Sequence, residues 1–243
     1  MEEGKPLTKK EKRVLAKEEK RKRRLKNAKT KQLKNWFIGL LVVIGLFFGG
    51  YKLWQWINTP TEIPQDILEI KSTDWIKGNL DAKLTLIEYA DFRCPACAAY
   101  SADAKKLVEE FPQDLRYVFR HFPLVSLHED AIDIARAAEA AGVQGKFWEM
   151  HDLIFQRQSE WEGDRNPVDK FISFAKELEL DEEKYRQDLN NKELNIKIND
   201  DLASANQLRL DATPTFFLNG ERMNTPRDYD EFKSLIEQAL SAD

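Results

Sequence analysis

The chain of 243 residues contains only two cysteines, Cys94 and Cys97, and both belong to one Cys-Pro-Ala-Cys motif. So few cysteines cannot hold together a disulfide-rich scaffold or ligate a four-cysteine zinc site or cluster. Two thiols at this spacing do suit thiol–disulfide exchange, in which a thiolate attacks a disulfide sulfur and forms a mixed disulfide. The motif therefore predicts redox chemistry at Cys94 and Cys97.

Two other uses of the cysteine pair are less favoured. Half of a zinc site would need two further ligands, and His121, His128 and His151 lie in three separate segments. A purely structural disulfide across two intervening residues would close a very small loop and would stabilise the fold little. No bound metal or cofactor is expected, because the cysteine pair is itself the redox group.

The motif lies where a predicted strand, Leu84–Ala90, passes into a predicted helix, Pro95–Phe111. Cys94 would then stand at the N-cap, and Pro95 suits the first helical position because its missing N–H costs nothing there. The free N–H groups and the positive end of the helix dipole would stabilise a thiolate on Cys94 and lower its pKa. Cys97, one turn further on, should be more buried and should resolve the mixed disulfide.

The elements that must position this motif alternate between strand and helix. The remaining predictions are a strand at 115–122, helices at 129–142, 147–156 and 167–180, a polar and mostly helical stretch at 181–208, a strand at 215–218 paired through an Asn219–Gly220 turn with 221–223, and a helix at 228–240. The order βαβ, helical insertion, ββα predicts a mixed α/β sheet with helices on both faces.

A second motif, Thr213-Pro214, directly precedes the strand at 215–218. A proline at the start of a strand donates no hydrogen bond to the ladder, and taken alone it would be a turn proline. Combined with the cysteine motif and the order of elements, it is consistent with a cis proline at a functional site.

Four segments together resemble the DsbA-like branch of the thioredoxin superfamily: EYADFRCPACAAY, YVFRHFPL, ARAAEAAGVQGKFWEMHDLIF and ATPTFFLNG. They occur in the family's order from about residue 71 to the C-terminus, with a helical insertion at about 127–208. The resemblance implies a thioredoxin fold and activity as a thiol:disulfide oxidoreductase outside the cytoplasm. Such a protein would exchange its Cys94–Cys97 disulfide with thiols of exported proteins, most simply as an oxidant.

The resemblance also implies catalytic roles for individual residues. Cys94 would be the exposed nucleophile and Cys97 the resolving thiol, with Pro214 facing the disulfide. Glu88, on the strand six residues before Cys94, matches a buried acid that accepts or relays a proton near the resolving thiol. Two alternatives stay open: Glu88 faces outward from its strand, or Asp91 takes this role.

Substrate binding is implied on both sides of the cysteine pair. The backbone at Thr213 and Pro214 would pair with an extended substrate segment by strand addition, and Pro95 and Ala96 would lie on the substrate-facing surface. The Pro-Ala dipeptide lacks the imidazole found in the most oxidising members, which removes one source of thiolate stabilisation. We therefore expect an oxidant of less extreme potential. His151, outside the motif, is expected to pack or hydrogen-bond within the fold.

The charge of the chain is very unevenly placed. Residues 1–35 contain 15 Lys/Arg against 5 Glu, a net charge of +10, which leaves −14 for the remainder. Between the two lies Trp36–Ile57, a mostly apolar stretch of 22 residues. As a helix it would be about 33 Å long, enough to cross a hydrocarbon core of about 30 Å. This pattern predicts one transmembrane helix that acts as a signal anchor.

Alternatives to the anchor are less favoured. A cleaved signal peptide would have a shorter leader and a small-residue cleavage site after the apolar run, and a buried core helix is rarely apolar on every face. Because Lys and Arg beside a span stay in the cytoplasm, the N-terminus is expected there and the acidic domain in the periplasm or outside the cell. The basic run resembles a nucleic-acid patch, but next to a span it is more simply a topology signal with affinity for anionic lipid.

The predicted organisation is therefore a basic cytoplasmic tail at 1–35, a transmembrane anchor at 36–57, a linker at 58–70 and a thioredoxin-like domain at 71–243. Expected partners are the lipid bilayer and exported proteins with free thiols, with no nucleic acid. The resemblance adds a quinone-linked membrane partner that reoxidises the cysteine pair.

Two competing functions remain at this stage. A reductase or isomerase would use the same residues in the opposite direction, although the sequence shows no evident dimerisation module of the kind isomerases of this type use. A non-enzymatic binding module would use the fold as a scaffold, and it would have no need of two thiols at the start of a helix.

Overall fold

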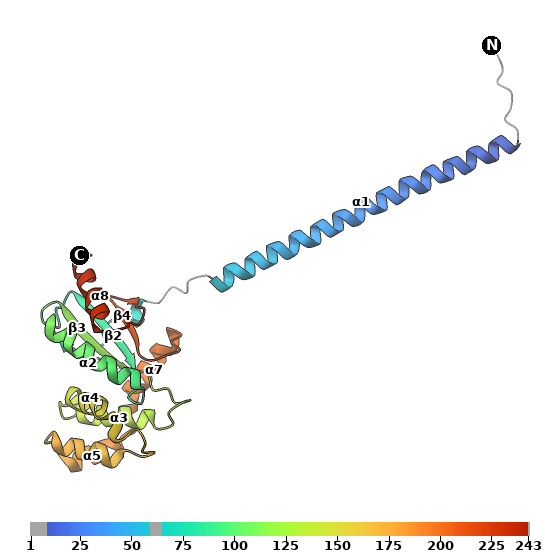
Figure 1. The fold of residues 1–243 in the computed structure, drawn as a ribbon. Coiled ribbons are helices and arrows are strands. Elements are labelled where there is room, and N and C mark those ends of the chain that lie inside the picture. Colours follow the sequence, from blue (N-terminus) through green and yellow to red (C-terminus); the bar gives the residue numbers. More distant parts are fainter. Residues whose placement is uncertain (1–8, 59–64, 243) are drawn as a thin grey trace. The chain divides into compact units, whose positions relative to one another are not determined.

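The computed structural model describes residues 9–58 and 65–242, which fall into two units, Met1–Glu62 and Ile63–Asp243 (Figure 1). The described part of the first unit is a single helix, α1 (Lys9–Asn58), of 50 residues. Within α1, Lys34–Gln55 is long and apolar enough to cross a membrane. This stretch overlaps the predicted anchor, and the helix continues through the basic segment back to Lys9. The middle of the predicted linker, 59–64, lies outside the described residues.

The second unit contains a five-stranded mixed sheet with the strand order β1-β3-β2-β4-β5. The strands are β1 (Trp75–Gly78), β2 (Leu84–Ala90), β3 (Leu115–His121), β4 (Thr215–Leu218) and β5 (Glu221–Arg222). β2 and β3 run parallel, and all other neighbours are antiparallel. The edge strand β1 is absent from the sequence-based prediction, whereas β2 and β4 have the predicted bounds.

The helices of this unit follow the predicted order closely. They are α2 (Pro95–Glu110), α3 (Ala131–Gly142), α4 (Phe147–Gln156), α5 (Val168–Glu177), α6 (Glu182–Leu189), α7 (Asn195–Gln207) and α8 (Tyr229–Ala242), with short 3-10 turns η1 (Gln65–Ile67), η2 (Gln158–Glu160) and η3 (Lys192–Leu194). Helices α3 to α7 all lie between β3 and β4 in the chain. Figure 1 shows α3, α4 and α5 grouped next to α2.

The two faces of the sheet carry two separate cores, because successive residues of a strand point to opposite faces. On one face Leu84, Leu86 and Ala90 of β2 belong to the larger core, which also contains Cys97 of α2. On the other face Ile87 and Tyr89 pack in a smaller core with residues of α7 and of the loop after it. The alternation along β2 places Glu88 on the larger core's face.

A buried ion pair fastens the segment before β1 to the sheet. The Arg120 guanidinium donates to both carboxylate oxygens of Asp74, at 2.8 and 3.1 Å, and neither side chain is exposed. It also donates to the carbonyls of Ile67 (2.7 Å) and Glu69 (2.6 Å) and to the hydroxyl of Tyr89 (3.0 Å). Arg120 thus links the backbone of the segment before β1 to strands β2 and β3.

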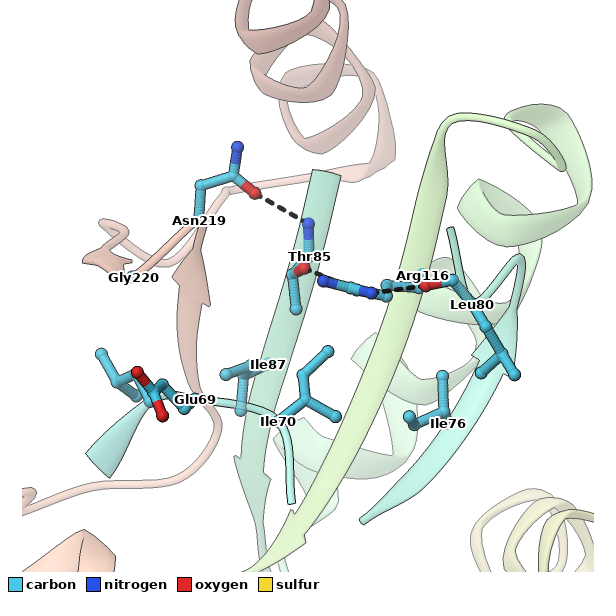
Figure 2. A pocket seen from close by; sticks show the side chains of 10 residues that line it. Glu69, Ile70, Ile76, Leu80, Thr85, Ile87, Arg116, Asn219 and Gly220 are labelled. Carbon is cyan, nitrogen blue, oxygen red and sulfur yellow. Dashed lines mark hydrogen bonds between the residues drawn. The ribbon is translucent and has the colours of Figure 1, made fainter. Parts of the chain in front are cut away.

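A pocket of about 560 Å³ opens on the sheet face opposite α2, near the start of β2 (Figure 2). Arg116 lies across its floor and donates to Thr85 Oγ1 (2.8 Å) and to the carbonyl of Leu80. The Asn219 side chain accepts from the backbone N–H of Thr85 at 2.8 Å. The cysteines follow the other end of β2, so this pocket is not part of their surroundings.

Candidate active site

Cys94 and Cys97 occupy the positions that the sequence predicts for them. Cys94 is the N-cap residue of α2 with extended backbone angles, and Pro95 takes the first helical position. Both cysteines are free thiols; Cys94 is partly exposed and Cys97 is 0 % exposed. Pro95 and Ala96 between them are exposed. One sulfur is therefore accessible to another protein, and the other is reached only through it.

The surroundings separate the two thiols strongly in acidity. A hydrogen bond from the Cys97 thiol, supported by Thr213 and by the backbone N–H groups of Cys97 and Ala96, lowers the pKa of Cys94 to about 5 against the opposing effect of burial. Burial raises the pKa of Cys97 well above its ordinary value, and the neighbouring Cys94 and Glu88 act in the same direction. At neutral pH this arrangement holds one thiolate and one thiol.

This difference predicts the alkylation behaviour of the reduced protein. Iodoacetamide should modify Cys94 alone, with a rate that rises through a midpoint near pH 5, because only the thiolate reacts. Mass spectrometry of the alkylated protein across pH 3.5–9 measures both the site and the midpoint. The denatured chain is the control, in which both cysteines should react at rates that rise with pH through a midpoint of about 8.5. If Cys94 in the folded protein also reacted with a midpoint of about 8.5, it would not be a stabilised thiolate. That result would favour a scaffold without redox function.

The Thr213-Pro214 motif lies directly beside Cys94, although 119 positions separate Cys94 and Thr213 in the chain. Its peptide bond is cis. The Cys94 Sγ lies 3.4 Å from the carbonyl oxygen of Thr213, to which it donates when it is protonated, and Pro214 is buried directly before β4. The fold therefore joins the two motifs singled out in the sequence into one site.

Glu88 lies beneath the cysteines inside the larger core and is 0 % exposed. Its burial excludes the outward-facing alternative. The Tyr117 hydroxyl donates to Glu88 Oε2, while Oε1 is buried without a hydrogen-bond partner among the described residues. Burial raises the pKa of Glu88 to about 8; the Tyr117 hydrogen bond opposes this shift, and the charge of Cys94 adds to it. The Glu88 carboxyl thus has a pKa near neutrality and lies close enough to Cys94 for the charge of that residue to affect it.

Asp91, the alternative to Glu88, has its carboxylate committed elsewhere. It accepts from the backbone N–H groups of Arg93 (2.8 Å) and Leu124 (2.9 Å) and contacts Nδ1 of His128 at 2.8 Å. These contacts connect the turn after β2 to the loop after β3. They favour Glu88 over Asp91 as the proton acceptor.

Arg93, immediately before Cys94, is a site residue that sequence reasoning missed. Its guanidinium forms a bidentate ion pair with the Asp130 carboxylate and donates to the carbonyls of Glu162 and Asp164. It thereby ties two loops of the helical insertion to the start of α2. The one available signal was a charged residue adjoining the motif, which does not reveal its partners.

His151 is buried among aromatic rings of the larger core, with Phe119 at 4.8 Å and Phe155 at 5.0 Å between ring centroids. Burial lowers its pKa to about 4, so it is neutral at pH 7, and its Nδ1 contacts Asp152 at 2.9 Å. This is the packing role expected from the sequence. Within residues 9–58 and 65–242, no group of three or more His, Cys, Asp or Glu could hold a metal ion.

Comparisons with known proteins point to one family by sequence. A family model described as "Thioredoxin" matches residues 71–238. Among curated relatives, the Na(+)/H(+) antiporter NhaA 1 of Salinispora arenicola is 36% identical over 168 residues, covering 69% of this chain and 25% of the antiporter. The NhaA antiporter of Herminiimonas arsenicoxydans is 40% identical over 164 residues, covering 68% and 25%. The chain thus spans only about a quarter of the length of these antiporters.

Solved structures with a similar fold include BdbD from Bacillus subtilis in its oxidised state, at a TM-score of 0.61 and 25% identity over 68% of this chain and 92% of that one. A thioredoxin-like oxidoreductase from Silicibacter pomeroyi superposes with a TM-score of 0.62 at 25% identity, covering 75% and 100%. Wolbachia pipientis alpha-DsbA1 gives a TM-score of 0.66 at 22% identity, covering 73% and 96%.

Proposed function

Since this chain belongs to the thioredoxin family, in its DsbA-like branch, we propose that it is an extracytoplasmic protein thiol:disulfide oxidoreductase that oxidises thiols of exported proteins. Membership also confirms the predicted fold class, an α/β thioredoxin-like sheet with a helical insertion. The observation that carries the proposal is the asymmetry of the cysteine pair: an accessible, stabilised thiolate at a helix N-terminus above a buried, protonated thiol.

The proposed reaction begins with the Cys94–Cys97 disulfide. A substrate thiolate attacks Cys94 Sγ, the Cys94–Cys97 bond breaks, and the electron pair leaves on Cys97, which takes a proton. Glu88 is suited to give that proton, because with a pKa of about 8 it is mostly protonated at pH 7. A second substrate thiolate then attacks the substrate sulfur of the mixed disulfide and releases Cys94 as a thiolate. The substrate loses two electrons and gains one disulfide, while the protein becomes the dithiol.

The acidity of Cys94 supports the oxidising direction. A stabilised thiolate favours the reduced form of the protein, and a protein whose reduced form is stabilised is a stronger oxidant. The helix N-terminus and the Cys97 thiol supply this stabilisation without an imidazole inside the motif. An oxidant of intermediate strength is therefore favoured over a reductase or isomerase.

Substrate would bind to the surface that Pro95 and Ala96 form together with Ala212 and Thr213, the segment before Pro214. Ala212 is exposed and Thr213 is partly exposed, so the backbone here is open to an extended peptide that adds as a short strand. A cysteine in such a peptide would lie next to Cys94. The proposed partners are thus exported proteins with free thiols.

The cellular placement is proposed from α1. Its apolar stretch, Lys34–Gln55, would anchor the protein in the membrane, and the basic segment before it would stay in the cytoplasm near anionic lipid. The catalytic domain would then face the periplasm or the cell exterior, where a quinone-linked membrane partner would reoxidise it. Ion transport is not part of the proposal, since the chain spans only about a quarter of the antiporters it matches.

The reduction potential of the cysteine pair tests the proposed direction. The full chain in detergent should equilibrate with glutathione at a potential clearly above the value of about −270 mV typical of thioredoxin, towards the value of about −120 mV of the most oxidising relatives. Quantifying dithiol and disulfide forms by mass spectrometry after acid quenching gives the number. A potential at or below thioredoxin's would overturn the oxidant assignment and support a reductase.

A further inference from the structure

In the part of the chain that the structure describes, one side chain hydrogen-bonds to the Glu88 carboxyl, and that side chain is a phenol. Tyr117 is 1 % exposed and donates its hydroxyl hydrogen to Glu88 Oε2. The register of the parallel pair places Leu86 opposite Tyr117 and Glu88 opposite Phe119. Tyr117 is therefore the diagonal neighbour of Glu88 on the same face of the sheet, a distance that a tyrosine spans.

We propose that Tyr117 is a positioning residue for the exchange reaction, which holds Glu88 by one carboxylate oxygen and leaves the other, Oε1, free to trade a proton with Cys97. The inference rests on the proposed function and names a residue beyond it. Oε1 is buried and lacks a hydrogen-bond partner among the described residues. A buried acceptor without a partner costs free energy, and a catalytic role is one reason for a protein to keep such a group. Cys97 is the buried group whose protonation Glu88 influences.

The phenol also determines whether Glu88 can work in both directions. Burial alone favours the protonated carboxyl, whereas a donated hydrogen bond favours the carboxylate. With Tyr117 in place the two effects leave the pKa of Glu88 at about 8, close enough to neutrality for the group to release a proton and to take one. Without the phenol, Glu88 would stay protonated to higher pH and could not accept the proton of Cys97.

The charged groups around this pair do not replace the phenol. At the start of α2, Cys94 acts on Glu88 and Cys97 acts on Tyr117, and the group beyond Tyr117 is Asp152 of α4. The charge of Asp152 is compensated by Lys105 Nζ at 2.8 Å and Lys77 Nζ at 3.5 Å, and the neutral His151 contacts the same carboxylate through Nδ1 at 2.9 Å.

Trp148 contacts both Lys77 and the phenol. Its ring contacts the Tyr117 ring at 5.4 Å, and Lys77 stacks on it at 4.6 Å. Among the described residues, Tyr117 is the side chain that donates a hydrogen bond to Glu88.

The step that depends on Tyr117 is the resolution of a mixed disulfide. The Glu88 carboxylate takes the proton of the Cys97 thiol, the Cys97 thiolate attacks Cys94 Sγ, and the bond between Cys94 and the outside sulfur breaks. The outside sulfur leaves with the electron pair and is protonated by solvent. One disulfide is lost and one is formed, so atoms and electrons balance.

The test is Tyr117→Phe in the full chain, with Cys94 loaded with glutathione as the outside sulfur. The rate of glutathione release, followed by acid quenching and mass spectrometry, should depend on pH with a midpoint about one to two units higher than in the wild type. Tyr185→Phe is the matched control, because its buried hydroxyl donates to the carbonyl of Ala137 (2.9 Å) away from the cysteines; its profile should follow the wild type. In a Glu88→Gln background, Tyr117→Phe should cause no further shift.

A Tyr117→Phe profile that overlays the wild type, or an equal shift in the Glu88→Gln background, would overturn the inference. Infrared titration of the buried carboxyl gives a measurement independent of turnover: its C=O band should titrate at higher pH in Tyr117→Phe, and an unchanged titration would also overturn it. Failure of the proposed function looks different, since glutathione would then not be released by Cys97 even in the wild type.

Discussion

Replacing Cys94 with serine should abolish thiol–disulfide exchange, whereas replacing Cys97 with serine should preserve the first attack and stop the reaction at the mixed disulfide. Serine forms no disulfide, and the remaining Cys97 in the first variant is 0 % exposed with a raised pKa. In the second variant Cys94 keeps its place at the helix N-terminus, although a serine hydroxyl replaces the Cys97 thiol whose hydrogen bond contributes most to its acidity. The two variants should therefore fail at different steps.

Two measurements distinguish loss of the first attack from a stop at the mixed disulfide. In oxidative refolding of a reduced substrate protein, both variants should show only the background rate. When the reduced variants are mixed with a disulfide-containing substrate, Cys97→Ser should accumulate a covalent adduct on non-reducing gels and Cys94→Ser should give none. Retention of refolding activity by Cys94→Ser would contradict the proposed mechanism. Adducts on Cys97 would mean that Cys97 is the nucleophile and Cys94 the resolving thiol.

The local part of the site could be predicted because it depends on neighbours in sequence. A β-rich run before the motif and a proline after Cys94 were enough to place Cys94 at the N-cap of α2. The approach of Thr213 to Cys94 depends instead on β4 pairing with β2, and without the family resemblance no local signal connects residues 119 positions apart. The role of Arg93 depends on loops of the insertion and was not predictable.

Glu88 illustrates the same limit within one strand. Alternation shows that neighbouring residues of β2 face opposite ways, but both faces of this sheet are covered, so the pattern does not show which residues share a core with Cys97. The pairing of Tyr117 with Glu88 follows only from the register of β2 and β3. The missed strand β1 is similar, since its four residues, WIKG, are held by pairing with β3 and carry no pattern of their own.

The largest loss of stability is expected from Arg120→Met, which removes the main partner of the buried Asp74 carboxylate and leaves it with only Lys197 Nζ at 3.6 Å and the backbone N–H of Lys71 at 2.9 Å. Removing one member of a buried ion pair typically costs about 3–5 kcal/mol of the free energy of unfolding, and here the carbonyls of Ile67 and Glu69 lose their donor as well. Urea unfolding of the full chain in detergent, followed by tryptophan fluorescence, measures the loss at pH 7. Arg227→Met is the matched control, because its ion pair with Glu231 lies in solvent and should leave the free energy of unfolding nearly unchanged.

The effect of Arg120→Met should also depend on pH in a defined direction. Burial alone would raise the pKa of Asp74, but the hydrogen bonds and charge of Arg120, with smaller contributions from the Lys71 backbone N–H and the charge of Lys197, hold it below its ordinary value of 3.8. A carboxyl with a lowered pKa stabilises the fold above its unfolded-state pKa, and this contribution is lost as the pH falls through the folded-state value. In the variant Asp74 can protonate at higher pH, so the difference in stability from the wild type should be largest near neutrality and should shrink below about pH 4.

A second substitution shows whether the loss comes from the unpaired charge or from the missing side chain. Arg120→Met combined with Asp74→Leu removes both charges, and replacing a whole buried pair with apolar residues is often close to neutral. The double variant should therefore recover most of the stability lost in Arg120→Met and lose its dependence on pH between 4 and 7. If the double variant stayed as unstable as Arg120→Met, the hydrogen bonds to Ile67, Glu69 and Tyr89 would carry the stabilisation, and the segment before β1 would depend on Arg120 as a donor rather than as a charge.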